Sequence, residues 1–160
     1  MTIQVDTREK PQAIGKILKQ FDELGIKHFS SKLYVGDYVS LENPMLVIDR
    51  KADLQEICGN VCQQHARFVG ELDRAIEVGI HLIILCTHSP QIRCIDDVAG
   101  WVNPRLKTSP KALTGEKLAK MLKSIERRHG CEFRFCSRAD AGFVIANILS
   151  GGEIGADKGR

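Results

Sequence analysis

Two acids and a lysine in one stretch of the chain have the chemistry of a metal-dependent site that acts on phosphates. Asp37, Asp49 and Lys51 lie in two largely apolar segments, residues 33–41 and 45–51, which have the composition of β-strands. The short polar segment between them contains a proline and favours a turn. The sequence therefore predicts a β-hairpin that holds the three charged groups close together.

The expected register places the two acids opposite each other. Side chains alternate between the faces of a strand, so Asp37, Asp49 and Lys51 all fall on apolar faces of the hairpin. If the turn is centred on Asn43, opposed residues have numbers that sum to 86, which pairs Asp37 with Asp49. Like charges at roughly 5 Å are destabilising unless a cation neutralises them. Carboxylates without nitrogen or sulfur ligands suit Mg²⁺ or Mn²⁺.

Lys51 follows Asp49 by two residues, hence roughly 6.6 Å along the same face. An ammonium group beside a metal can hold an attacking water and stabilise charge on phosphoryl oxygens. The alternative is purely structural: the glycine before Asp37 bends the strand, and residues 49–51 are a solvated, charged strand end. A register slip of one residue would turn every side chain to the other face.

Three motifs in order resemble the XPF-type nuclease domain of the PD-(D/E)XK nuclease superfamily. They are Val5-Asp6-Thr7-Arg8-Glu9, Leu33-Tyr34-Val35-Gly36-Asp37-Tyr38 and Val47-Ile48-Asp49-Arg50-Lys51. The segment from Arg67 to Arg74 is similar to small, often phage-borne members, and a weaker likeness continues to the last helix. The resemblance implies a restriction-endonuclease-like fold and a metal-dependent DNA endonuclease, structure-selective and used in recombination or repair.

The resemblance also implies a role for each matched residue. Asp37 and Asp49, with the backbone carbonyl of Arg50, would bind the Mg²⁺ or Mn²⁺ ion, and Lys51 would be the catalytic lysine. Asp6 would be a further catalytic acid that lies beside the metal and holds it through water. The substrate-binding residues would be Arg8, Glu9 and Arg67.

Two of these residues have alternative roles, and a basic segment provides three further candidates for contact with DNA. Arg8 and Glu9 could instead pair with each other or cap the following helix. Residues 103–111 carry three cations that could contact DNA phosphates from a loop, or could form an ordinary solvated loop. These cations are Arg105, Lys107 and Lys111.

The chain departs from the family pattern in three places. Asp49 stands where relatives usually have glutamate, which shortens the ligand by one methylene. The acid expected four residues after the lysine is absent, which leaves Asp53 or Glu56 as the outer ligand. We also expect the chain to lack the helix-hairpin-helix domain of larger relatives, so a homodimer or protein partner would supply DNA selectivity. The alternative function is a catalytically silent DNA- or protein-binding module on the same fold.

Periodicity predicts the elements that position these residues. Apolar residues at helical spacing indicate three long helices, over residues 11–24, 53–78 and 114–129, with His65 on the apolar stripe of the second. The remaining elements are strands at 3–6, 81–86 and 131–136, a short helix at 96–102 and a final helix. Helices that alternate with strands after a hairpin predict an α/β domain with a mixed sheet flanked by helices. We expect this domain in residues 1–150, followed by a disordered tail at 151–160.

Composition is compatible with this function but does not require it. The 160 residues are 43% hydrophobic, which suits one domain. The 23 basic and 20 acidic residues give a net charge of +3, which permits a polyanionic partner. There is no glycine-rich phosphate loop after a strand, which disfavours an unrelated α/β enzyme for small molecules.

The compartment is predicted from what the sequence lacks. It shows no signal segment and no apolar run of roughly 20 residues, so we expect no membrane partner and a cytoplasmic protein, nuclear if eukaryotic. None of the six cysteines forms a Cys-x-x-Cys zinc pattern. They are expected to be buried, reduced thiols.

Overall fold

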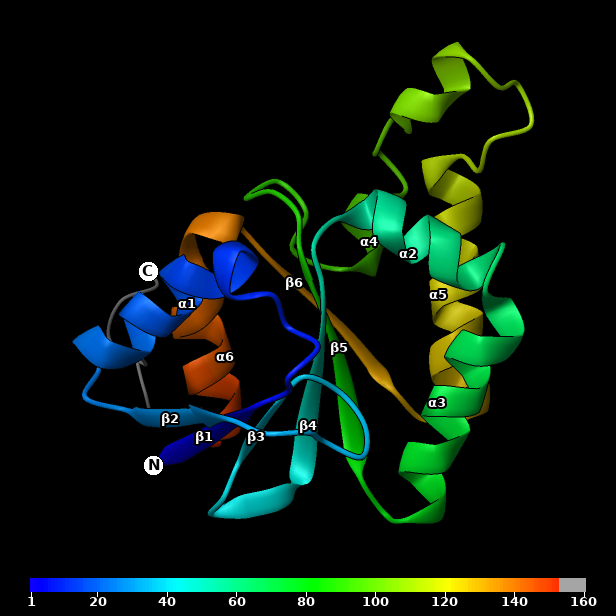
Figure 1. Ribbon diagram of the computed structural model, residues 1–160. Helices are drawn as coiled ribbons and strands as arrows, with labels where there is room; N and C mark the ends of the chain where they lie inside the picture. The colour runs from blue at the N-terminus through cyan, green and yellow to red at the C-terminus, as the bar shows by residue number, and fades with distance from the viewer. Residues whose placement is uncertain (153–160) are drawn as a thin grey trace.

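The computed structural model describes residues 1–152, which form a six-stranded sheet between two layers of helices (Figure 1). The strand order is β2-β1-β3-β4-β5-β6. β3 runs antiparallel to β1 and β4, and the other neighbours are parallel. The strands are β1 (Thr2–Val5), β2 (Lys27–Ser30), β3 (Tyr38–Ser40), β4 (Asn43–Lys51), β5 (His81–Thr87) and β6 (Glu132–Cys136). The predicted mixed sheet is confirmed.

Helices cover both faces of this sheet, as predicted. One face packs against α1 (Pro11–Glu23) and α6 (Ala141–Leu149) around a core that includes Phe21 and Tyr38. The other face packs against α2 (Leu54–Val61), α3 (His65–Glu77) and α5 (Gly115–His129) around a core that includes Leu72 and Ile84. Shorter pieces are α4 (Ile95–Val98) and the 3₁₀ turns η1 (Pro104–Lys107) and η2 (Arg138–Asp140). No helix within residues 1–152 is long and apolar enough to span a membrane.

The first strand of the predicted hairpin is shorter than expected. Only β3 is a strand, and residues 33–37 form a loop that leads into it. Gly36 has a left-handed backbone with φ of 73°, which glycine adopts without a steric penalty. A Cβ atom at this position would also collide with the side chain of Val47 and press on the carbonyl of Ile48. The glycine therefore lets the loop lie directly against β4, immediately before Asp37.

The hairpin register agrees with the prediction, although the turn does not. The turn lies at residues 41–42, and β4 already includes the proline that we placed in the turn. A register shift next to Ser40 takes up the additional residues of β4. The opposed pairs nearest the site are Tyr38 with Ile48 and Val39 with Val47, which have the predicted sum. This register brings Asp37 beside Asp49.

Other predicted boundaries were wrong for identifiable reasons. The expected helix over residues 53–78 is divided into α2 and α3, because no buried apolar side chain anchors the chain between Val61 and Phe68. His65 is exposed in that interval and does not belong to the core. The edge strand β2 was not predicted, since its mostly exposed residues carry no regular apolar alternation. The short helix predicted at 96–102 begins one residue earlier and ends at Val98.

The C-terminal end and the cysteines also differ from expectation. Gly151 and Gly152 form a turn that caps α6, and the Gly152 N–H donates to the Asn147 carbonyl at 2.8 Å. Residues 153–160 of the predicted tail lie outside the described residues. All six cysteines are free thiols, but Cys62 and Cys94 are exposed and not buried as expected.

Candidate active site

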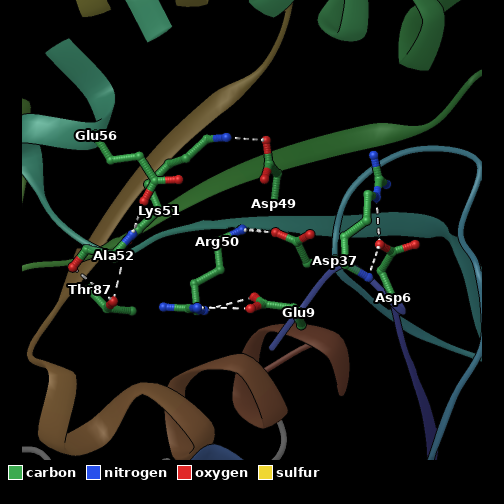
Figure 2. A network of polar contacts seen from close by, with 10 residues as sticks. Asp6, Glu9, Asp37, Asp49, Arg50, Lys51, Ala52, Glu56 and Thr87 are labelled. Carbon is green, nitrogen blue, oxygen red and sulfur yellow. Dashed lines mark hydrogen bonds and ion pairs between the residues drawn. The ribbon is translucent and has the colours of Figure 1, made fainter. Parts of the chain in front are cut away.

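The predicted charged groups, except Asp6 and the three cations of residues 103–111, meet in one pocket of about 280 Å³ at the end of β4. Figure 2 shows Asp49 and Lys51 on one side of β4, and Arg50 with Glu9 on the other. The pocket is lined by Arg8, Glu9, Asp37, Asp49, Arg50, Lys51, Glu56, Arg67 and Glu71. Residues distant in the sequence are thus brought together by the central strands, the loop before β3 and the helices α2 and α3.

Asp49 and Lys51 form a buried ion pair on one face of β4. The Lys51 Nζ lies 3.1 Å from the Asp49 Oδ2, and the side chains of Lys51 and Asp49 are only 11% and 7% exposed. Burial by itself lowers the pKa of Lys51, but the nearby carboxylates, Asp49 first, outweigh burial and raise it. The lysine is therefore held as a cation beside the acids, 5.8 Å from the centre of the Phe68 ring.

Asp37 adds a second carboxyl group that the lysine does not fully compensate. Its Oδ2 accepts a hydrogen bond from the Arg50 backbone N–H at 2.8 Å. Burial, followed by the negative charges of Asp49 and Glu9, raises the pKa of Asp37 to about 9. The hydrogen bond from Arg50 acts in the opposite direction but is the smaller effect. Ionised Asp37 thus requires a further positive charge in this pocket.

Glu9 and Arg50 form a second buried ion pair, on the opposite face of β4 (Figure 2). Arg50 Nε and Nη2 each donate to a different oxygen of Glu9 at 2.8 Å. The side chains of Arg50 and Glu9 are 13% and 8% exposed. The expected alternatives for Glu9, pairing with Arg8 or capping α1, are both absent, since no side chain caps that helix. Glu9 instead ties the N-terminal segment to β4.

Asp6 is fully buried and organises the loop before β3. Its carboxylate accepts from the backbone N–H of Leu33 at 2.7 Å and from the backbone and Nε of Arg8 at 2.9 and 2.6 Å. Burial raises the pKa of Asp6, but these donors together outweigh it and hold the pKa below its usual value. Arg8 Nη2 also donates a hydrogen bond to the carbonyl of Gly36 at 3.4 Å. Asp6 does not line the pocket, and both of its oxygens are engaged.

The structure distinguishes the two candidates for an outer acid and adds a third. Asp53 caps α2 by accepting from the Glu56 N–H at 2.8 Å, whereas Glu56 lines the pocket and accepts from the Ala52 N–H at 2.7 Å. Glu71 also lines the pocket, and we did not predict it. Its spacing of four residues from Arg67 on one helix places both on the same face, which is the signal that could have found it.

Residues 103–111, which we call the basic arm, carry three cations that do not enter this pocket. Arg105, Lys107 and Lys111 are exposed. The arm lies between α4 and α5 and extends away from the body of the molecule (Figure 1). It has an ordered base, because the buried Asn103 accepts from the Arg105 N–H at 3.0 Å and donates to the Leu113 carbonyl at 2.9 Å.

A mixed sheet with helices on both faces and an acid and lysine at the end of a central strand defines a restriction-endonuclease-like fold. Among solved structures, XPF from Aeropyrum pernix is similar, with a TM-score of 0.64 and 15% identity. A structure of XPF from Aeropyrum pernix in complex with DNA gives a TM-score of 0.63 and 17% identity. Each comparison covers 93% of this chain but 63% of the other.

The predicted XPF-like nuclease fold is thus confirmed in the structure. No protein-family model matches the sequence, and no curated protein does. At this level of identity the similarity establishes the fold, and the chemistry of the pocket depends on the residues of this chain.

Proposed function

We propose that this chain is a metal-dependent DNA nuclease that hydrolyses phosphodiester bonds in the pocket at the end of β4. The observation that carries the proposal is the cluster of the buried Asp49 and Lys51 with the half-buried Asp37. Two carboxyl groups share this space with one ammonium group, and burial raises the pKa of Asp37 to about 9. Such an arrangement is unfavourable for a stable core and suited to a site that takes up a cation.

The residues fit Mg²⁺ or Mn²⁺. Asp37 and Asp49 would hold the ion together with the backbone carbonyl of Arg50. N–H and C=O of one strand residue point to the same side, so this carbonyl faces the side on which the Arg50 N–H meets Asp37. Within residues 1–152, no three His, Cys, Asp or Glu side chains are arranged to hold a metal, so water or substrate would complete the ligand set. The ion would supply Lewis-acid activation of the phosphodiester and of water.

The other side chains either face the substrate or hold the substrate-facing residues in position. Lys51 would orient the attacking water and stabilise negative charge on the phosphoryl oxygens. Arg8 and Arg67 line the pocket and would bind the phosphate backbone. Asp6 would act by holding Arg8, and Glu9 by holding Arg50.

DNA is the proposed substrate, and the basic arm would contact it outside the pocket. The DNA complex of XPF, which has the same fold, supports this choice. Arg105, Lys107 and Lys111 would neutralise phosphates without reading sequence. Structure selectivity, a role in repair or recombination, and a homodimer or protein partner are further parts of the proposal. An intracellular location, nuclear if eukaryotic, stays a prediction.

A cleavage assay tests the proposal. Wild type and Asp49→Ala are incubated with linear duplex, single-stranded, flapped and four-way DNA in Mg²⁺, in Mn²⁺ and in EDTA. Wild type should cut at least one substrate only with metal, and Asp49→Ala should cut none. Metal-independent cutting, or equal cutting by the variant, would rule out this mechanism. DNA binding without cutting of any substrate would instead support the catalytically silent module.

A further inference from the structure

A second pocket, which we call the edge pocket, lies at the ends of β4 and β5 and encloses about 400 Å³. Its wall includes Lys16 and Ile17 from α1, Arg50 from the end of β4, Ala52 directly after that strand, Thr87 from the end of β5, and Arg138 from η2. Arg50 lines both this pocket and the candidate active site. The two pockets are therefore neighbours that meet at the end of one strand.

The alternation of side chains along β4 separates Asp49 and Lys51, which line only the active-site pocket, from Arg50, which lines both pockets. Lys51 points toward Asp49 on one face, while Arg50 points toward Glu9 on the other (Figure 2). Lys51 lines the active-site pocket and Ala52 lines the edge pocket, and the Thr87 hydroxyl lies within hydrogen-bond distance of both of their carbonyls, at 3.3 and 3.4 Å. A polymer that leaves the active site across the ends of β4 and β5 would reach the edge pocket next.

The charge of the edge pocket suits an anion. Its ionisable lining residues are Lys16, Arg50 and Arg138, and no acid of the described chain lines it. Arg50 is already neutralised by Glu9. Within residues 1–152, no ion pair involves Lys16, whose side chain is exposed. Lys16 thus remains unpaired, and Arg138 has only the partly exposed Asp53 as its ion-pair partner in this part of the chain.

Arg138 is held in place and remains accessible. Its Nε donates to the carbonyls of Ala52 and Thr87 at 3.4 and 3.3 Å, which fixes the base of the guanidinium group to the sheet edge. Its only ion pair in residues 1–152 is with Asp53, at 3.5 Å from Nη2, and the arginine side chain is 64% exposed. An arginine anchored in this way presents its remaining N–H groups to solvent, in the geometry that binds phosphate.

We propose that the edge pocket binds a backbone phosphate of the DNA strand adjacent to the phosphate in the active site, through Lys16 and Arg138. This inference rests on the proposed function, because it assumes that the same strand occupies both pockets. The contact is to phosphate and not to a base, so it should act on every sequence alike. Its expected effect is to fix the direction in which the strand crosses the sheet edge.

The test measures DNA binding in Ca²⁺ at several salt concentrations. The test variant is Lys16→Gln with Arg138→Gln, and the control is Lys19→Gln with Arg128→Gln, which removes the same charge from positions outside the pocket. We expect the test variant to bind roughly tenfold more weakly at low salt and its salt slope to fall by about one. The control should keep the wild-type slope. Equal losses of affinity in both variants would overturn the proposal.

Uncharged methylphosphonates at single positions of the DNA then locate the contact. Wild type should bind more weakly when any one of the contacted phosphates is replaced, and the test variant should be insensitive at one of those positions alone. An unchanged interference pattern in the variant would overturn the edge pocket even if the protein cuts DNA. If the pattern changes as expected but nothing is cut, the nuclease proposal fails and the edge pocket stands. If wild type does not bind DNA, both fail.

Discussion

The last residues of β4 carry two ion pairs on opposite faces, and the pairs differ in how completely their charges are satisfied. On one face, Glu9 and Arg50 form two parallel hydrogen bonds of 2.8 Å, with one acid for one base. On the other face, Lys51 meets Asp49 while Asp37 adds a further acid. The satisfied pair holds the architecture together. The face that carries a second carboxyl group, Asp37, is the one that we propose takes up a cation and a phosphate.

The largest difference between the faces should appear in catalysis. Lys51→Ala should reduce single-turnover cleavage by roughly 100- to 1000-fold, because it removes the cation that stabilises developing negative charge. Binding of DNA in Ca²⁺ should change little, and Lys120→Ala, an exposed lysine on α5, should behave as wild type. Cleavage by Lys51→Ala at the wild-type rate would show that this face is not the catalytic one.

Substitutions on the opposite face should change the free energy of unfolding. Glu9→Gln leaves Arg50 buried without its counter-charge and should lower the free energy of unfolding in urea by about 3 kcal/mol. Glu132→Gln breaks exposed pairs with Arg134 and His81 and should cost less than about 1 kcal/mol. The double variant Glu9→Leu with Arg50→Met should recover most of this stability, since it leaves no unpaired charge. Equal effects of Glu9→Gln and Glu132→Gln would contradict the structural role of Glu9.

A smaller effect should depend on pH. The pKa of Asp37 is raised to about 9, well above its value in an unfolded chain, so the folded state binds the extra proton between about pH 4 and pH 9. Stability in EDTA should therefore fall as pH rises through this window. Asp37→Asn cannot ionise, so its stability relative to wild type should increase as pH rises through this window. Melting temperatures from pH 5 to pH 9 test this, and a difference that does not grow with pH would be inconsistent with the raised pKa.

The basic arm lies away from both faces and should have the smallest effect on chemistry. Replacing Arg105, Lys107 and Lys111 with glutamine should weaken DNA binding and reduce the salt slope by roughly 0.9 for each phosphate that the arm no longer neutralises. The cleavage rate at saturating DNA should stay within about twofold of wild type. A large fall in that rate, measured in single turnover, would place the arm in the catalytic machinery instead.

The central part of the site was predictable because strand alternation constrains it strongly. Acids and a lysine on an otherwise apolar face are a conflict that the sequence shows directly, whereas the opposed register was inferred from a turn centred on Asn43. The prediction of that register was correct even though the turn was misplaced. A local shift in β4 compensated for the error, and the sequence carries no clear signal for such a shift.

The surroundings of the site were less predictable, since they depend on tertiary contacts. Asp6 matches a metal-site motif, yet its carboxylate is used by Arg8 and the Leu33 N–H in the folded chain. Glu71 and the partner of Glu9 were missed because their contacts join segments far apart in sequence. Helix spacing limits which residues share a face, but it does not say which face meets the end of β4.

A calorimetric titration with Mn²⁺ tests the central claim most directly, because it asks whether the unbalanced face binds a cation. Wild type and Lys51→Ala should each bind Mn²⁺, whereas Asp49→Ala should show no binding, and Glu9→Gln should retain it if folded. Mn²⁺ should also raise the melting temperature of wild type and leave that of Asp49→Ala unchanged. Equal binding by wild type and Asp49→Ala would contradict the assignment of Asp37 and Asp49 as the metal site.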